Sequence, residues 1–125
     1  MKPNPVVWFE IYVADMTRAR RFYQSVFGST LTRMEDPDGE SEMWAFPMTD
    51  GGDGAAGALV RMAGAAPGGG GTLVYFACED CAVEAGRVEA AGGRVERPKF
   101  PIGPHGHIAL VVDTEGNRIG LHSMR

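Results

Sequence analysis

The sequence contains one pattern of elements twice, and this internal repeat limits the possible folds more than any other feature. In the first copy, residues 7–13 alternate like a strand, and a helical stretch over 15–28 begins with Asp and ends with Gly. In the second copy, residues 72–78 alternate in the same way, and residues 80–93 again run from Asp to Gly over the same length. Two equivalent modules build a common site where they meet, so the repeat indicates where function should lie.

Each half is predicted to have the order βαβββ. Aspartate is a good helix N-cap and glycine a common helix end, so helices are expected over 16–26 and 81–91. The remaining strands are expected at 30–34, 43–48, 57–62, 94–97, 107–112 and 117–123, with turns at 36–39 and 113–116 and loops at 49–56 and 98–104. At 125 residues the chain is predicted to be a single α+β domain, with module 1 at 5–62, a Gly-rich linker at 63–71 and module 2 at 72–125.

The faces of the predicted strands follow from their two-residue period. Side chains expected to face the helices are Phe9, Ile11 and Val13 in the first half and Val74, Phe76, Ile119 and Leu121 in the second. The apolar stripe of the first helix is expected to be Ala19, Phe22, Tyr23 and Val26, with Arg18, Arg20 and Arg21 in solvent. One helix covers one sheet face, so the two modules are predicted to form a curved mixed sheet around a shared cavity. Its predicted lining is Trp8, Glu10, Tyr12, Ala58, Val60, Leu73, Tyr75, Ala77, His107, Ala109, Gly120 and His122.

Charge and hydropathy exclude several classes of partner. The chain is slightly acidic, with a formal net charge of −4 and no basic run, which removes the electrostatic case for nucleic acid or an anionic membrane surface. No apolar stretch approaches the roughly 18 residues needed to cross a bilayer. The sequence therefore predicts a cytoplasmic protein with neither partner.

The only two cysteines, Cys78 and Cys81, have the Cys-x-x-Cys spacing of a redox pair or half a zinc site. A zinc site needs about four ligands, and no second pair exists. Because Cys78 alternates with Val74 and Phe76, ordinary packing is the favoured interpretation.

Two motifs give the chain a resemblance to a known family. The opening motif is Asp15-x-x-x-Ala19-x-x-Phe22-Tyr23-x-x-x-Phe27-Gly28, and the closing one is the run Asp113-Thr114-Glu115-Gly116-Asn117-Arg118-Ile119-Gly120-Leu121. Over nearly its whole length the chain resembles the vicinal oxygen chelate superfamily, which includes glyoxalases, bleomycin resistance proteins and extradiol dioxygenases. The resemblance implies the two-module fold, a small-molecule ligand and a homodimer, but no single activity, because the superfamily includes lyases, dioxygenases, epimerases and drug binders.

Members of this family with chemistry generally hold a divalent metal through His and Glu on the first and last strand of each module. Carried over to this chain, those four positions are Trp8, Ala58, Leu73 and Gly120. None of these side chains binds a metal, so no metal cofactor is predicted, and binding through other residues stays open.

The candidate catalytic residues are polar side chains that lie two residues further along the same strands, on the same face. Glu10, Tyr75 and His122 are predicted to form a catalytic layer together with the apolar Val60. A carboxylate among aromatic rings can act as a general base, and a tyrosine can donate to an enolate oxygen. In the alternative, Glu10 pairs with Arg61 or Arg118 at a module or dimer interface, and His122 is a satisfied structural histidine near the C-terminus.

Trp8, Tyr12, Phe100 and His107 are the predicted ligand-binding residues. Phe100 lies in a Pro-rich segment expected to edge the cavity mouth, although a dimer contact or a plain connection is an equal alternative. The motif His105-Gly106-His107 is read as structural, because His105 lies in a Gly/Pro loop.

Three functions remain open on these observations. The first is a metal-independent binder of small molecules, similar to the drug-sequestering members of the family. The second is a glyoxalase-type lyase or isomerase with Glu10 as base, with or without a metal. The third is a non-catalytic subunit module. Whether the chain is an enzyme is left open by the sequence.

Overall fold

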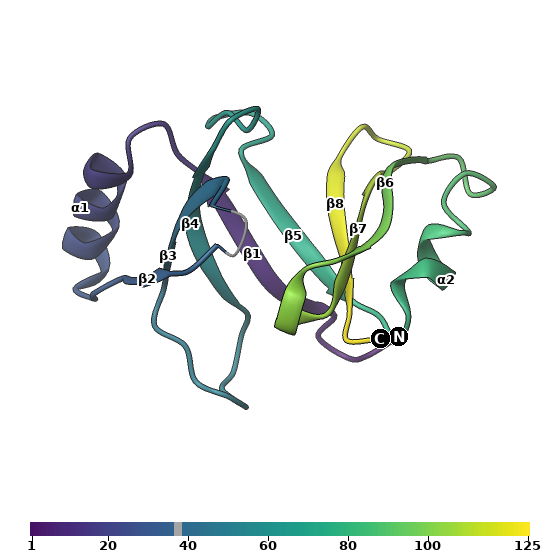
Figure 1. The fold of residues 1–125 in the computed structure, drawn as a ribbon, viewed down its shortest axis with the longest axis horizontal. Helices are drawn as coiled ribbons and strands as arrows, with labels where there is room; N and C mark the ends of the chain where they lie inside the picture. Colours follow the sequence, from purple (N-terminus) through teal and green to yellow (C-terminus); the bar gives the residue numbers. More distant parts are fainter. Residues whose placement is uncertain (37–38) are drawn as a thin grey trace. The chain divides into compact units, whose positions relative to one another are not determined.

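The structure, a computed structural model, describes residues 1–36 and 39–125. The chain forms two compact units, of which unit 1 contains Met1–Val7 and Leu73–Arg125 and unit 2 contains Trp8–Thr72. Helices and strands follow one another as βαβββ and then again as βαβββ (Figure 1). This order confirms the α+β class with two βαβββ modules.

Unit 2 is a sheet with one helix on it. Its elements are β1 (Val6–Tyr12, of which the first two residues belong to unit 1), α1 (Met16–Phe27), β2 (Thr32–Met34), β3 (Ser41–Ala45) and β4 (Ala56–Met62). The strand order is β2-β3-β4-β1, with β1 parallel to β4 and the other neighbours antiparallel. The strand expected at 30–34 ends at Met34 as predicted but begins two residues later, and the strand expected at 43–48 lies earlier, at Ser41–Ala45. The expected turn over 36–39 lies partly outside the described residues.

Helix α1 begins and ends where the sequence predicts. The side chain of Asp15 accepts a hydrogen bond from the backbone N–H of Arg18 at 2.9 Å, which satisfies one free donor of the first turn. Gly28 ends the helix in the left-handed conformation at φ 62°, which glycine adopts without a Cβ clash.

One face of α1 packs on the sheet. The buried cluster is Val13, Met16, Leu31 and Leu59, with Ile11, Ala19, Tyr23, Trp44 and Phe46 packed against it. The prediction that Ile11 and Val13 face the helix is confirmed. The prediction that Phe22 and Val26 join the stripe is wrong, because they are 58% and 57% exposed. The buried stripe runs through Met16, Ala19 and Tyr23, which leaves Phe22 at its border, edge-on to the ring of Tyr23.

Unit 1 repeats the arrangement. Its elements are β5 (Thr72–Ala77), α2 (Cys81–Ala85), β6 (Arg94–Pro101), the 3₁₀ turn η1 (Gly103–His105), β7 (His107–Val112) and β8 (Arg118–Ser123). The strand order is β5-β8-β7-β6, with β5 parallel to β8 and the other neighbours antiparallel. Figure 1 shows α2 beside β6, β7 and β8.

Two boundaries in unit 1 differ from the sequence predictions. Helix α2 ends at Ala85 instead of continuing to residue 91, because Gly86 follows it. The next backbone hydrogen bonds join residues three apart, as in a 3₁₀ turn, with Arg87 donating to Glu84 and Val88 to Ala85. Strand β6 continues through the predicted loop, because register shifts on both sides of Arg97 accommodate two prolines in an edge strand.

Both cysteines are free thiols in the core between α2 and the sheet of unit 1, Cys81 as the first residue of α2. Cys81 is 0% exposed within the core cluster of unit 1, and Cys78 packs against that cluster beside Phe76. Burial, with a further contribution from the nearby charge of Glu84, raises the pKa of the Cys78 thiol to about 11. A neutral thiol at physiological pH agrees with the packing interpretation.

No helix within the described part of the chain is long and apolar enough to cross a membrane.

Candidate functional site

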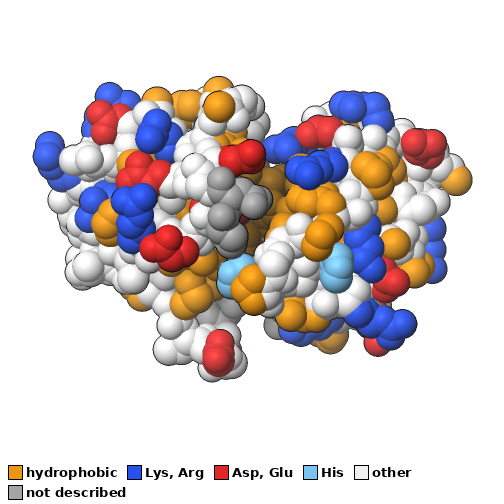
Figure 2. All heavy atoms as spheres, viewed as in Figure 1, with side chains coloured by type: hydrophobic (Ala, Val, Ile, Leu, Met, Phe, Trp, Pro, Cys, Tyr) orange, Lys and Arg blue, Asp and Glu red, His pale blue; other side chains and the backbone are white. Residues whose placement is uncertain are grey.

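In unit 2, the candidate residues lie on the sheet face opposite α1. Ile11 and Val13 pack with the helix cluster, so the alternating side chains Trp8, Glu10 and Tyr12 point to the other face, as the sequence predicts. A space-filling view of the molecule is given in Figure 2. These three residues form the candidate site of unit 2.

The carboxylate of Glu10 is held between its two aromatic neighbours. Trp8 donates from Nε1 to Glu10 Oε2 at 3.1 Å, and the hydroxyl of Tyr12 donates to Glu10 Oε1 at 2.7 Å. All three residues come from one strand at every second position, so the backbone itself sets their spacing. Each carboxylate oxygen receives one donor and retains lone-pair capacity for another.

The strand register places small side chains beside this carboxylate. Glu10 pairs with Ala58 on β4, and Ala58 pairs with Ala45 on β3. Tyr12 pairs with Val60, which pairs with Met43. The prediction that Glu10 shares a layer with Val60 is therefore wrong by two residues, because the parallel pairing of β1 with β4 starts at Trp8 and Ala56.

The equivalent face of unit 1 carries Tyr75 and Gly120. These residues are paired across β5 and β8, and Tyr75 is 7% exposed. A Cβ added to Gly120 would lie 2.8 Å from Cγ of Tyr75 and closer still to two other ring carbons. The ring of Tyr75 thus occupies the space that any side chain at position 120 would need.

This contact bears on the metal question. Gly120 is one of the four positions at which the resembled family carries a metal ligand. In this chain the ring of Tyr75 occupies the space that a ligand side chain at this position would need. At the other three positions stand Trp8, Ala58 and Leu73, of which Ala58 and Leu73 are 0% and 2% exposed. Within the described residues, no cluster of three or more His, Cys, Asp or Glu side chains is arranged to hold a metal ion. The residues present do not fit the family's metal.

His122 lies on the helix-free face of unit 1, as the sequence predicts. It pairs with Ala77 on β5 and with Ile108 on β7, so it does not pair with Tyr75. Its Nε2 lies 2.6 Å from the backbone carbonyl of His105, and it donates a hydrogen bond there. This bond commits one ring nitrogen of His122 to the η1 turn and leaves Nδ1 for other partners.

His107 lies on the opposite face from the one predicted. It pairs with Ser123, and its neighbour Ala109 belongs to the helix-facing cluster with Cys81 and Leu121. The sequence placed His107 and Ala109 in the cavity lining, which is wrong because their register on β7 matches the helix-facing residues of β8. Nδ1 of His107 is buried without a hydrogen-bond partner among the described residues.

Phe100 lies in the same row as His122. It pairs with Ile108, which pairs with His122, so all three belong to the helix-free face. The guanidinium of Arg97 stacks over the Phe100 ring, with Cζ 3.5 Å from the ring centroid. Arg97 was missed because the predicted strand ended at that residue, and the register shift that brings Arg97 and Phe100 onto one face has no signal in the sequence.

The basic residues considered as partners of Glu10 are engaged elsewhere. Arg61 pairs with Glu42 at 3.4 Å, and Arg118 pairs with Glu96 at 2.8 Å. Arg61 lies in the helix-side row of the sheet with Glu42, so it is not the partner of Glu10 within unit 2, and a pairing at a module or dimer interface stays a prediction. Within unit 2, Trp8 and Tyr12 supply the hydrogen bonds to the oxygens of Glu10.

Comparisons with known proteins agree with this architecture. The family model described as "Glyoxalase/Bleomycin resistance protein/Dioxygenase superfamily" matches residues 6–121. Two proteins named "Putative glyoxylase CFP32", from Mycobacterium bovis and Mycobacterium tuberculosis, are 28% identical over 116 residues, which is 91% of this chain. The chain spans only 43% of the length of these relatives.

Solved structures show the same fold at low sequence identity. A hypothetical protein from Bacillus halodurans C-125 has a TM-score of 0.72 at 12% identity, with 99% of this chain and 96% of that chain covered. A Streptomyces coelicolor methylmalonyl-CoA epimerase in complex with 2-nitronate-propionyl-CoA has a TM-score of 0.64 at 16% identity, with 93% and 91% covered.

Proposed function

Because the chain belongs to the Glyoxalase/Bleomycin resistance protein/Dioxygenase superfamily, we propose that it binds a small organic molecule at Glu10 without a metal. The observation that supports this most is the carboxylate of Glu10 held by Trp8 and Tyr12 on the helix-free face. The lack of fit to the family's metal positions supports the same function.

The arrangement favours a flat ligand that carries a hydrogen-bond donor or a positive charge. The half-buried ring of Trp8 offers a face to a flat molecule, and rings attract cations, whereas Tyr12 is 6% exposed and contributes through its hydrogen bond to Glu10. The remaining lone pairs of the carboxylate accept donors from the ligand.

Three probes of one shape and different charge test this proposal. Benzamidine, benzamide and benzoate are titrated while tryptophan fluorescence is recorded in a Trp44→Phe background, where Trp8 is the one remaining tryptophan of the two in the chain. Quenching should saturate with benzamidine, be weaker with benzamide and be absent with benzoate. In Glu10→Gln the preference for benzamidine over benzamide should disappear, because the amide side chain carries no charge.

Equal quenching by all three probes, or an unchanged preference in Glu10→Gln, would contradict the proposal. Glu42→Gln in the same background is the control, since it removes the same charge from a strand residue that lies on the helix side of the sheet.

A second candidate function is a lyase or isomerase with Glu10 as the base. It is supported by the fixed carboxylate together with the relatives named as glyoxylases and the fold neighbours described as methylmalonyl-CoA epimerases. In this function Glu10 removes a proton from the carbon next to a carbonyl. Deuterium incorporation into methylmalonyl-CoA in D₂O, measured by NMR and lost in Glu10→Gln, would support it; no incorporation above the protein-free rate would exclude this substrate.

The assembly and location proposed for the chain follow from family membership. We infer a homodimer of single-domain chains in the cytoplasm, with Phe100 and His122 on the helix-free face of unit 1 as further ligand contacts. Analytical ultracentrifugation of the purified chain tests the dimer, and a single monomeric species at all concentrations would contradict it.

A further inference from the structure

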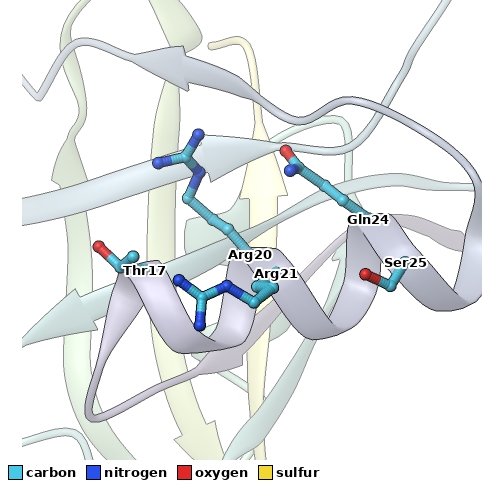
Figure 3. A pocket seen from close by; sticks show the side chains of 5 residues that line it. All are labelled: Thr17, Arg20, Arg21, Gln24 and Ser25. Carbon is cyan, nitrogen blue, oxygen red and sulfur yellow. The ribbon is translucent and has the colours of Figure 1, made fainter.

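A surface pocket of about 340 Å³ lies along α1, on the helix side of unit 2 (Figure 3). Its lining residues are Thr17, Arg20, Arg21, Gln24 and Ser25. They recur at helical spacing, so all five lie on one stripe of the helix. Every one of them carries a hydrogen-bond donor, and two carry a positive charge.

Arg20 is held in a fixed position at this pocket. Its guanidinium stacks over the ring of Trp44, with Cζ 3.4 Å from the ring centroid. Trp44 in turn donates from Nε1 to Glu42 at 3.0 Å. Stacking covers one face of the guanidinium and leaves its N–H groups at the edge, which is the geometry that matches an oxyanion.

One donor of Arg20 has no acceptor among the described residues. This donor is the N–H at Nε, which is buried. Glu42, the carboxylate that Trp44 contacts, already accepts hydrogen bonds from Trp44 and Arg61. A buried donor without an acceptor costs free energy, so it indicates a partner that comes from outside the chain.

Gln24 also presents donors. Its Oε1 accepts a hydrogen bond from the backbone N–H of Leu31 at 3.0 Å, which commits the acceptor end of the amide and leaves the NH₂ group. Figure 3 shows Arg20 and Gln24 extending in the same direction from the helix, with Thr17, Arg21 and Ser25 along the same stripe.

The charge distribution of α1 also favours an anionic ligand. Three arginines lie in the first half of the helix, its first turn has no acidic residue, and no ion pair among the described residues involves Arg20 or Arg21. Cations near a helix N-terminus are unfavourable. Figure 2 shows Lys and Arg side chains over the α1 part of unit 2 with acidic side chains among them.

We propose that this pocket binds a phosphate group, either free or as a phosphate ester, through Arg20, Arg21 and the donors of Thr17, Gln24 and Ser25. It lies on the opposite sheet face from Glu10, and the proposal does not depend on the ligand of Glu10.

A titration with inorganic phosphate at constant ionic strength, followed by ¹H–¹⁵N NMR, tests the site. The indole N–H signal of Trp44 should shift with saturation, because Arg20 stacks on that ring, whereas the signal of Trp8 should stay in place. In Arg21→Gln the affinity should fall roughly tenfold, the effect of one charge-assisted hydrogen bond. Arg20→Lys, which keeps the charge but loses the planar fork, should weaken binding by a similar factor.

Arg18→Gln is the matched control, since it removes the same charge from the same helix outside the pocket lining. Binding should change less than twofold in this variant. If phosphate produces no saturable shift of Trp44, or if Arg18→Gln weakens binding as much as Arg21→Gln, the proposal is overturned. Phenyl phosphate that binds more tightly than inorganic phosphate would identify an ester as the ligand, and equal affinity would identify the free ion.

Discussion

Substitution of Gly120 by Ala tests whether the ring of Tyr75 fills this position. The added methyl would lie within 3 Å of three ring carbons, a separation that requires the ring to move. Tyr75 is 7% exposed, so the ring has little space to move into. Overpacking of this kind costs about 1–3 kcal/mol, and the lower backbone entropy of Ala returns about 0.5–1 kcal/mol. We expect a net loss of about 1–2 kcal/mol and a melting temperature lowered by about 5 °C.

The matched control is Gly69→Ala, where an added Cβ meets no atom within 4 Å and the backbone has no positive φ. Urea denaturation of both variants, each also in a Tyr75→Ala background, measures the coupling between positions 75 and 120. In that background Gly120→Ala should cost little, because the ring is absent. A full cost without Tyr75, or a Gly120→Ala variant as stable as Gly69→Ala, would refute the reasoning.

Three further predictions concern the cap, the thiol and the ion pair. Asp15→Ala should lower the stability by about 1 kcal/mol in thermal melts, since it removes the α1 cap, whereas Asp15→Asn should retain most of it. Because the pKa of Cys78 is raised to about 11, its reaction with a disulfide reagent should be slow at pH 8 and should accelerate as the pH rises. Glu84→Gln should speed the reaction at pH 8, because it removes a charge that raises this pKa. A reaction as fast as that of free cysteine would contradict this prediction. The hydrogen bond from Lys99 lowers the pKa of Asp80, so its contribution to stability is present at neutral pH and lost as the pH falls through the folded pKa. Lys99→Met should therefore lower the melting temperature at neutral pH and not at the acid end; an equal loss at both would contradict the assignment.

The sequence predicted the features that local chemistry determines. Asp15 and Gly28 set the bounds of α1 because each satisfies a requirement of a helix end within a few residues. The alternation in β1 predicted that Trp8, Glu10 and Tyr12 share a face, because the period of a strand is a property of its backbone.

The features that were missed depend on pairing between distant residues. His107 was assigned to the wrong face because alternation divides a strand into two sets but does not say which set meets the helix; its pairing with Ser123 decides this. The prediction that Glu10 shares a layer with Val60 was wrong for the same reason, since the register of β1 against β4 is set by the whole module. The bonds from Trp8 and Tyr12 to Glu10 could be foreseen from their shared face, whereas the stack of Arg20 on Trp44 joins a helix to a strand and has no local signal.

The most direct test of the proposed site is the indole N–H signal of Trp8 in ¹H–¹⁵N NMR spectra, recorded in EDTA during a titration with benzamidine. Trp8 donates this proton to Glu10, so a ligand that contacts the carboxylate must alter the signal. We predict a saturable shift of the Trp8 signal, no shift of the Trp44 signal, and loss of the response in Glu10→Gln. A Trp8 signal that does not respond, or that responds only when a divalent metal is added, would contradict a metal-independent ligand site at Glu10.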